Sequence, residues 1–477
     1  MPTLPKTTMK NRSFLSRKRL AVTSVVALMA SLAACHGAVT DALLVTVIPT
    51  VINPSSVNSA AGADAVRLGA LGRLRNATGG AESSWLFGGL LADEWTTSST
   101  FIQNDEADER SITLTNATVT TQFQSLARVR TDANQAIALM KQYQPTALAN
   151  TGELYFARGF AELQLALDFC NGIPLSDGST ATAVLGLPLT NVQVFTAASA
   201  SFDSATALET GTDAFSVSIL TATRIAKART QMALNNYAAA AALVAGIATS
   251  YEYDNTFETT PSGPSGDNTL WNQPLSQRRY SVGDTIATVN GTVYKVKPSL
   301  PFGSAKDPRL PVANSPAKTL SQDGSVLSMT TSLWGSGTPV PVVSGIDARL
   351  IEAENFLKTG DVTNWLATLN TLRAAGTLHL GTVSVPVMPA LVDPGTAASR
   401  VDLLFYEKAF WTFSRGQRLG DMRRLIRQYG RDQTTVFPGT GGVHYRGVPY
   451  GPDVNLPVPQ NELIGNPNFK GCLDRNA

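Results

Sequence analysis

The stretch GELYFARGFAELQLALDFCNGIP, residues 152–174, decides the fold of this chain. Apolar side chains recur along its first part at the spacing of one helix face, and they predict a helix from about Gly152 to Phe169. The residues of this stripe are Leu154, Phe156, Phe160, Leu163, Leu167 and Phe169. Asn171-Gly172 and Pro174 then end the helix, because these residues favour a turn. The chain is expected to be helical here and to turn sharply afterwards.

The same helical spacing occurs on both sides of this stretch, over about 119–140, 217–235, 237–249, 346–358, 362–375, 400–413 and 417–429. Several of these segments are separated by very short turns. In one of them Gly360 suits the position just past a helix end, and Asp361 suits an N-cap. Arg130 lies on the apolar stripe of the first segment, so we expect it to be paired inside the bundle. The pattern predicts a mostly-α scaffold of tetratricopeptide-like helical hairpins, although no strict internal repeat is present.

Two regions differ from this scaffold in composition. Residues 254–343 are rich in Pro, Gly, Ser, Thr and Asn and contain short strand-like runs such as 292–296, which indicates a long irregular insert. Scattered aromatic residues in the insert argue against disorder. Residues 432–477 are irregular as well. We therefore expect one domain over 35–477, with its helical scaffold at about 55–253 and 344–430.

The N-terminal residues have the features of a secretory signal. Residues 1–34 carry six basic and no acidic residues, and an apolar run extends from Leu20 to Ala34. Leu32-Ala33-Ala34 directly precedes Cys35, which resembles the bacterial lipoprotein box, where the Cys becomes the lipidated N-terminus. An ordinary signal peptide followed by a chance Cys is the alternative. Lipidation at Cys35 would anchor the protein to a membrane outside the cytoplasm.

Removal of residues 1–34 changes the charge balance of the chain. The full chain has 38 basic and 36 acidic residues, and the loss of the six basic residues leaves a formal charge of −4. A mildly acidic chain lacks the basic footprint of a nucleic-acid-binding protein. No segment after residue 34 offers the roughly 20 apolar residues of a membrane-spanning helix. We therefore expect lipid, and not a helix, to hold the protein at the membrane.

Sequence motifs for catalysis or metal binding are absent. The histidines His36, His379 and His444 have no metal-ligand spacing, and neither does any pair of cysteines. No nucleophile elbow, P-loop or dinucleotide fingerprint occurs. Pairs of carboxylates such as Asp93-Glu94 do occur, and a glycosidase needs no more than such a pair. We nevertheless expect no enzyme activity, no cofactor and no metal.

Two cysteines follow Cys35, namely Cys170 and Cys472. In an oxidising compartment they are expected to form a disulfide. This disulfide would tie the C-terminal tail to the end of the helix over 152–169. Two buried free thiols are the alternative.

Six segments occur in a fixed order after the lipoprotein box. They are residues 52–71, 90–94, 152–175, 349–373, 407–424 and 456–468, and they include Leu-Ala-Asp-Glu at 91–94, Gly-Glu-x-x-Phe-x-Arg-x-Phe from 152, and Gly-x-Arg-x-x-Asp-x-x-Arg from 416. Together they resemble the SusD/RagB family of outer-membrane nutrient-uptake lipoproteins over nearly the whole mature chain. Two residues depart from the family pattern, Lys408 in place of an Arg and Arg415 in place of a Glu. The resemblance implies a SusD-like fold.

The resemblance also implies a function. It indicates a non-catalytic lipoprotein on the exterior of the outer membrane, which binds an oligomeric nutrient, most often a glycan, and caps a SusC-like TonB-dependent transporter. Sugar capture needs flat aromatic faces, and the candidates are Trp85, Trp95, Trp271, Tyr280 and Trp334. A gating partner that holds no ligand tightly and a peptide-binding member of the family are the alternatives. The low charge of the insert argues against a strongly acidic glycan.

The charged residues of the family motifs have a second interpretation. These residues are Glu153, Arg158, Glu407, Arg418, Asp421 and Arg424. We expect them to form ion pairs and helix caps that fix the hairpins, because pairs such as Asp421 with Arg424 or Arg418 with Asp421 stand at helical spacing. A ligand site built from these residues is the alternative.

Overall fold

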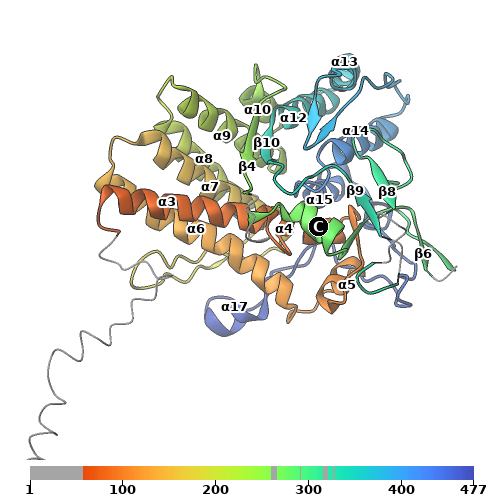
Figure 1. The fold of residues 1–477 in the computed structure, drawn as a ribbon, viewed down its shortest axis with the longest axis horizontal. Coiled ribbons are helices and arrows are strands. Elements are labelled where there is room, and N and C mark those ends of the chain that lie inside the picture. The colour runs from red at the N-terminus through yellow and green to blue at the C-terminus, as the bar shows by residue number, and fades with distance from the viewer. Residues whose placement is uncertain (1–56, 259–265, 290–291, 315–320, 326–327) are drawn as a thin grey trace, which may run out of the picture. The chain divides into compact units, whose positions relative to one another are not determined.

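The apolar stripes of the sequence become a row of packed helices in the computed structural model, which describes residues 57–258, 266–289, 292–314, 321–325 and 328–477 (Figure 1). The row consists of α3 (Ala60–Gly79), α6 (Ala117–Tyr143), α7 (Leu148–Asp168), α8 (Asn191–Leu208), α9 (Ala214–Ala233), α10 (Tyr237–Val244), α12 (Gly345–Lys358) and α13 (Val362–Ala374). Each helix of the row packs against the next. The expected scaffold of helical hairpins is confirmed, and 57–477 form one compact unit.

Helix α7, the helix of the deciding stretch, lies at the centre of this row. It packs against α3, α6, α8, α9 and α15, so that nearly all of its residues from Thr151 to Asp168 are buried. Phe156 contacts both Phe202 and Tyr253, with ring centroids 6.2 and 4.9 Å apart. A helix buried on several sides explains why its sequence is apolar beyond one face.

The expected ends of α12 and α13 are also present. Gly360 has a φ of 80°, a left-handed conformation that glycine adopts without steric cost. The Asp361 side chain accepts a hydrogen bond from the Asn364 backbone N–H at 3.0 Å and so caps α13. At the start of α12, Ser344 and Asp347 form a reciprocal capping box.

Helix α8 was not expected from the sequence. Its residues are rich in Ala, Ser and Thr, and on its buried face the large side chains Phe195 and Phe202 are accompanied by small ones, namely Ala198, Ser201 and Ala205. Such a face gives a weak apolar stripe. Tight packing against α7 decides the helix instead, because Gly159 lies against Phe202 and leaves no room for a side chain.

Short strands fasten the irregular insert to the scaffold. The strand β4 (Glu252–Asn255) pairs antiparallel with β10 (Val340–Ser344), so the two ends of the insert meet. Near its middle, β5 (Tyr280–Val282) pairs with β1 (Trp95–Thr97). The strand-like run at 292–296 forms β7 (Thr292–Lys295), which pairs with β6 (Ile286–Val289). Every sheet in the described part of the chain has two antiparallel strands, and the others join β2 (Ile173–Pro174) to β3 (Pro188–Leu189), β8 (Val312–Asn314) to β9 (Met329–Thr331), and β11 (His379–Leu380) to β12 (Val383–Ser384).

The remaining helices close the unit around the insert. They are α4 (Ser84–Leu91), α5 (Ile102–Asp108), α11 (Thr269–Trp271), a π-helical turn over Asn272–Ser276, α14 (Ala397–Trp411), α15 (Arg418–Tyr429), α16 (Gln433–Val436) and α17 (Gln460–Gly465). Helix α15 packs against α4, α7 and α14 and so joins the early and late parts of the chain. No helix within the described ranges is long and apolar enough to cross a membrane.

The C-terminal tail is held against the end of α7. Cys170 and Cys472 form a disulfide, with the two sulfurs 2.05 Å apart. Beside it, the Asn171 side-chain amide donates to the Asp474 carboxylate at 3.0 Å. The signal segment and the lipidation residue Cys35 lie outside the described residues.

Candidate functional site

Four of the five aromatic residues expected to face a ligand are buried in the core. Trp85, Trp95 and Tyr280 have no exposed surface, and Trp334 is 4% exposed. A sugar ring cannot stack on a side chain without an exposed face, so the expectation is wrong for these four residues. Trp271 on α11 is half-buried and stays a candidate.

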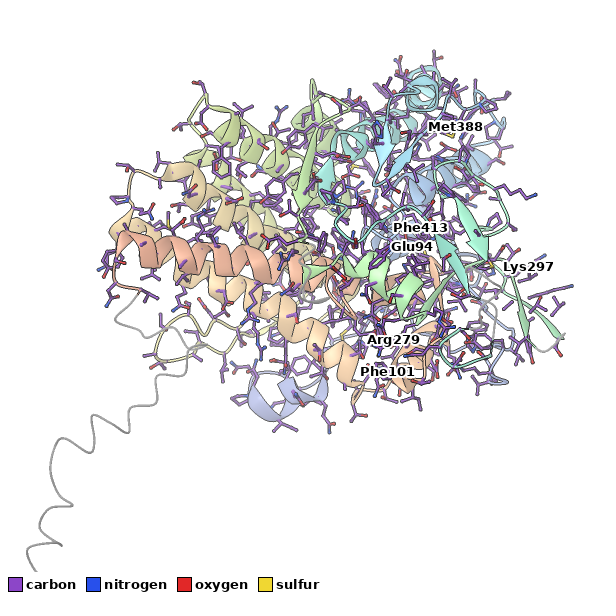
Figure 2. The ribbon with its side chains drawn as sticks, viewed as in Figure 1. Glu94, Phe101, Arg279, Lys297, Met388 and Phe413 are labelled. Carbon is purple, nitrogen blue, oxygen red and sulfur yellow. A yellow bond between two sulfur atoms is a disulfide. The ribbon has the colours of Figure 1, made fainter. Side chains whose placement is uncertain are left out.

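The surroundings of Trp95 show why these rings are inside. The pairing of β1 with β5 places the Trp95 and Tyr280 rings 6.3 Å apart, and Phe413 packs edge-on against Trp95 at 5.0 Å. The Trp95 Nε1–H donates to the Ser414 hydroxyl at 3.0 Å, so its polar atom is satisfied without a ligand. Phe413 and the neighbouring Glu94 lie together near the centre of the molecule (Figure 2).

Most of the charged motif residues form buried ion pairs, as expected. Glu407 accepts from Arg309 Nη1 at 2.7 Å and from Arg373 Nη1 at 2.9 Å. Glu153 accepts from Arg67 at 2.7 Å. Arg415, which departs from the family pattern, pairs with the buried Asp347 at 2.8 Å. These contacts join helices to one another and to the insert, which is a structural role.

The densest of these networks surrounds Glu354 on α12. Its carboxylate accepts from Lys408 at 2.9 Å, from Arg424 and from the Tyr429 hydroxyl at 2.6 Å. Arg424 also pairs with Asp421 at 3.0 Å, so the pair expected from helical spacing is confirmed. Burial by itself would raise the pKa of Glu354, but the charges of Arg424 and Lys408 lower it to about 2.

Two arginines differ from the expected pairing. Arg158 donates to the Ser201 hydroxyl and to the Asn134 side-chain oxygen, both at 3.0 Å, and so pairs with neutral groups. Arg418 donates from Nε to the Ala92 carbonyl at 3.1 Å and forms no ion pair with Asp421. Arg130, by contrast, pairs with Glu162 at 2.9 Å inside the bundle, as expected.

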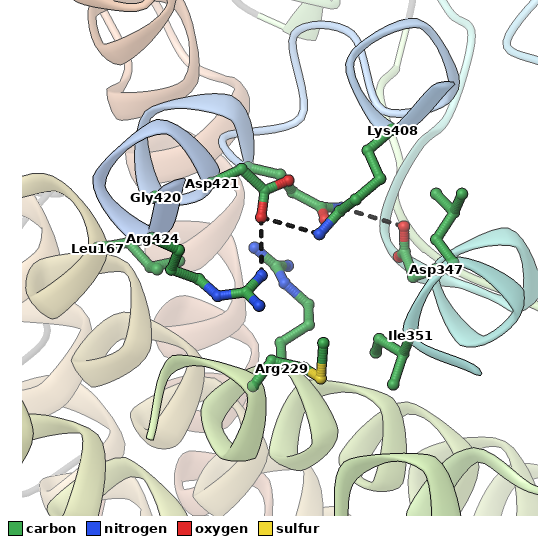
Figure 3. A pocket seen from close by; sticks show the side chains of 11 residues that line it. Leu167, Arg229, Asp347, Ile351, Lys408, Gly420, Asp421 and Arg424 are labelled. Carbon is green, nitrogen blue, oxygen red and sulfur yellow. Dashed lines mark hydrogen bonds and ion pairs between the residues drawn. The ribbon is translucent and has the colours of Figure 1, made fainter. Parts of the chain in front are cut away.

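A small cavity with several charged lining residues lies where α9, α12 and α15 meet (Figure 3). Arg229 extends into it from α9 towards Asp421, and both Nη atoms of Arg229 are buried without a hydrogen-bond partner. Burial lowers the pKa of Arg229 to about 10. The cavity measures about 30 Å³, which is room for one or two water molecules. It is too small to hold an oligomeric nutrient.

A larger groove lies between α14, α15 and the loop at 298–300. It measures about 340 Å³, within the range of small-molecule sites. Its walls are apolar side chains and its rim is polar, and the lining residues are Pro298, Ser299, Leu300, Asp402, Phe405, Tyr406, Arg418, Met422, Leu425, Arg431, Thr435 and Val436. We take this groove as the candidate functional site.

The half-buried Tyr406 is the aromatic residue of the groove that can meet a ligand. Its ring packs against Phe410 with centroids 4.8 Å apart, which fixes the position of the side chain. Its hydroxyl has no hydrogen-bond partner among the residues that the structure describes, so it is available to a ligand. At the rim, Arg431 donates to Asp402 at 2.7 Å and ties the two helices together.

Two buried carboxyl groups lie beneath the groove, at the turn that follows α4. Asp93 adopts a left-handed φ of 63°, and its Oδ2 is buried without a hydrogen-bond partner. Burial raises the pKa of Asp93 well above its usual range and the pKa of Glu94 to about 7, although Arg418 opposes both shifts. A hydrogen bond from the Ser414 N–H to Glu94, at 2.9 Å, also opposes the shift of Glu94.

Sequence reasoning did not find Tyr406, Asp402 or Ser299. The walls of the groove come from segments about 100 residues apart, and each segment looks like ordinary helix or loop by itself. Arg418 was the one lining residue that the sequence analysis had named, but it was expected to form an ion pair and not to line a groove. Among the described residues, no group of three His, Cys, Asp or Glu side chains could hold a metal ion.

The fold defined by these elements is a mostly-α row of helical hairpins that carries a loop-rich insert. Among solved structures it is similar to a SusD-like protein from Bacteroides fragilis (TM-score 0.62, 12% identity, 88% of this chain and 98% of that chain covered). A SusD/RagB family protein from Bacteroides thetaiotaomicron has a TM-score of 0.59 at 13% identity, with 85% and 94% covered. A SusD-like carbohydrate binding protein from Bacteroides vulgatus has a TM-score of 0.57 at 13% identity, with 86% and 97% covered.

The chain therefore has the SusD-like fold, as its sequence motifs indicated. No family model matches the sequence, and no curated protein matches it either. At 12–14% identity the likeness lies in the three-dimensional arrangement.

Proposed function

We propose that this protein is a non-catalytic SusD/RagB lipoprotein that binds a glycan. In this proposal Cys35 carries the lipid that anchors it to the exterior of the outer membrane, and the protein caps a SusC-like TonB-dependent transporter. The observation that carries the proposal is the SusD-like fold over 85–88% of the chain in the structures compared, one of which is named a carbohydrate binding protein.

The groove beside Tyr406 gives this proposal a location. A sugar presents C–H surfaces that pack on aromatic and apolar side chains, and hydroxyls that need hydrogen-bond partners. Leu425 and Val436 supply apolar surface, and Tyr406 supplies a ring edge with a free hydroxyl. The rim supplies oxygen acceptors: the Asp402 carboxylate, which also pairs with Arg431, and the hydroxyls of Ser299 and Thr435, which donate their own protons to the Val296 and Asp432 carbonyls. The site needs no cofactor.

A binding screen tests the proposal. The chain from residue 36 onward, which lacks the lipidated Cys, would be titrated by calorimetry with neutral oligosaccharides, acidic oligosaccharides and short peptides. We expect saturable binding of an oligosaccharide and a loss of about tenfold or more in affinity for Tyr406→Ala. Tyr143→Ala is the matched control, because Tyr143 is half-buried at the far end of α6.

The other results identify the alternatives. Binding of peptides alone would favour a peptide-binding protein with this fold. If the folded protein binds no compound of the panel, the result would favour a gating partner without a tightly held ligand. The transporter part of the proposal is tested separately by affinity capture from detergent-solubilised outer membranes, and recovery of no barrel protein would contradict it.

A further inference from the structure

Arg418 is a buried cation that forms no ion pair with any of the described residues. It is 8% exposed and lines the groove. Its Nε donates to the Ala92 carbonyl at 3.1 Å, and its guanidinium lies over the Phe302 ring at 5.6 Å. Among the described residues, no acceptor lies within hydrogen-bond distance of its Nη atoms, and no carboxylate oxygen lies within 4.0 Å. The N–H groups of Nη1 and Nη2 are therefore unused by the described residues, in a side chain that lines the groove.

Several other buried arginines pair with carboxylates within the protein, whereas Arg110 and Arg423 donate only to neutral oxygen atoms. Arg309 pairs with Asp307 and Glu407, Arg415 with Asp347, and Arg424 with Glu354 and Asp421. Arg229 and Arg423 also have Nη atoms without a hydrogen-bond partner, but the cavity at Arg229 in Figure 3 admits only water-sized groups, and Arg423 does not line the groove. Arg418 alone among these lies beside a groove of about 340 Å³.

Three carboxyl groups interact with the charge of Arg418, namely those of Glu94, Asp93 and Asp421. Asp421 is engaged by Lys408 at 2.9 Å and by Arg424 at 3.0 Å. Asp93 and Glu94 are buried below the groove and do not reach the guanidinium. A cation that is nine-tenths buried and has no carboxylate in direct contact gains from an anion that binds to it.

We propose that Arg418 receives the carboxylate of an acidic sugar unit, so that the groove selects glycans that carry uronic or other sugar acids. The planar guanidinium matches a carboxylate with two parallel N–H···O bonds, which a neutral hydroxyl cannot form. Tyr406 and the apolar wall would hold the ring of the same unit. This inference rests on the proposed glycan-binding function and names the class of its ligand.

One acidic unit per site is compatible with the low overall charge of the chain. A strongly acidic polymer needs a broad basic surface, whereas a single carboxylate needs one well-placed guanidinium. The rim cation Arg431 is already paired with Asp402 and adds little net charge.

The test compares each acidic ligand with its own neutral form. Oligosaccharides that contain glucuronic, galacturonic or N-acetylneuraminic acid would be titrated by calorimetry beside the same compounds as methyl esters. We expect the acid of at least one pair to bind about tenfold or more tightly than its ester. The difference in affinity between acid and ester should shrink as the salt concentration is raised from about 50 to about 500 mM, because salt screens the charge interaction.

Variants of Arg418 assign the difference to this residue. Arg418→Gln should bind acid and ester alike, and Arg418→Lys should keep part of the preference because it keeps the charge but loses the planar fork. Arg73→Gln is the matched control, because Arg73 is an exposed arginine of α3 that pairs with Asp132 and does not line the groove, and it should change the preference by less than about threefold. Melting temperatures confirm that each variant is folded, and the acid-to-ester ratio of the unmodified protein tests the proposal even if a variant fails to fold.

The outcomes separate this inference from the proposed function. Equal binding of acid and ester, with Tyr406→Ala still weakening both, would overturn the acidic-sugar inference and leave glycan binding intact. An acid preference that survives in folded Arg418→Gln would also overturn it. No binding of any sugar would overturn both. Preference for sulfated over carboxylated sugars would overturn the carboxylate assignment.

Discussion

At the residue scale, one carboxylate decides how three late helices are held together. Glu354 is completely buried and accepts from Lys408, Arg424 and Tyr429. Removal of its charge would leave two buried cations facing each other with one remaining anion, Asp421. Breaking a buried network of this kind is far more costly than losing an exposed pair.

We therefore expect Glu354→Gln to lower the free energy of unfolding by about 3–5 kcal/mol. Glu352→Gln is the control on the same helix, because Glu352 pairs with Arg349 at a half-exposed site and its loss should cost less than about 1 kcal/mol. Urea denaturation of both variants measures the difference. Similar costs for the two variants would contradict a special role for the buried carboxylate.

Sequence spacing predicted part of this network and missed part of it. The Asp421–Arg424 pair follows from the geometry of one helix, so it could be predicted. The other partners come from other helices: Glu354 lies 70 residues from Arg424 along the chain, and Lys408 lies 13 residues from Asp421. No local pattern shows these contacts. The free guanidinium of Arg418 was missed for the same reason, because its lack of a partner depends on the positions of distant carboxylates.

At the element scale, helix α15 begins and ends next to two glycines with the same backbone conformation. Gly416 and Gly430 have φ values of 64° and 65°. A Cβ on Gly416 would collide with the Trp85 ring, whereas a Cβ on Gly430 would meet open space. The backbone cost of a side chain is shared by both sites, and the steric cost belongs to Gly416 alone.

We expect Gly430→Ala to cost about 1 kcal/mol of stability from the left-handed backbone. Gly416→Ala should cost about 1–3 kcal/mol more, because the buried Trp85 must move. Thermal and urea unfolding of the two variants measure the difference directly. Equal destabilisation would mean that the Trp85 ring can yield without cost.

The helices that the sequence predicted best are those with large apolar side chains at regular spacing, such as α7. Helix α8 was missed because only Val194, Phe195 and Phe202 are large apolar residues on its buried face and the rest of that face is small or polar. The ends of the insert gave no sign that β4 and β10 would pair. The aromatic platform was predicted wrongly because composition does not tell an exposed tryptophan from a buried one. Burial of Trp95 depends on Phe413 and Tyr280, which lie far from it in the sequence.

At the scale of the whole molecule, the disulfide attaches the last residues to the central helix. It closes a loop of 302 residues between Cys170 and Cys472. Cross-links over long loops restrict the unfolded chain most, and their loss typically costs about 2–5 kcal/mol. We expect the Cys170→Ser/Cys472→Ser double variant to unfold at lower urea concentration and its tail to be cut early by a protease. Unchanged stability would show that the tail is held by its other contacts alone.

Buried carboxyl groups give the whole molecule a characteristic dependence on pH. Burial raises the pKa values of Glu94 and Asp168 to about 7, far above 4.5 and 3.8. A raised pKa means that the folded state binds the proton more tightly than the unfolded state. The stability from each group is therefore fully present below its unfolded pKa and is lost as the pH rises to about 7, at up to about 1.4 kcal/mol per pH unit.

Glu354 acts in the opposite direction at lower pH. Its folded pKa of about 2 lies below 4.5, so its stabilisation is present above pH 4.5 and is lost as the pH falls towards 2. We expect the melting temperature to rise from pH 8 to about 5.5 and to fall below about pH 4. Glu94→Gln should flatten the first change, and a steady fall from pH 8 to 5.5 would contradict the assignment.

The contact between Ala92–Trp95 and Ser414–Arg418 has a consequence for how the chain is made. Hydrogen bonds there join residues 319 to 326 positions apart. At about 5–20 residues per second, a ribosome needs about 15–60 s to produce the intervening chain. During this interval Trp95 and its apolar neighbours have no partner and are exposed to aggregation. A chain with such distant contacts is well suited to be kept unfolded by a holding chaperone until synthesis ends, and contacts between residues more than 300 positions apart favour slow folding afterwards.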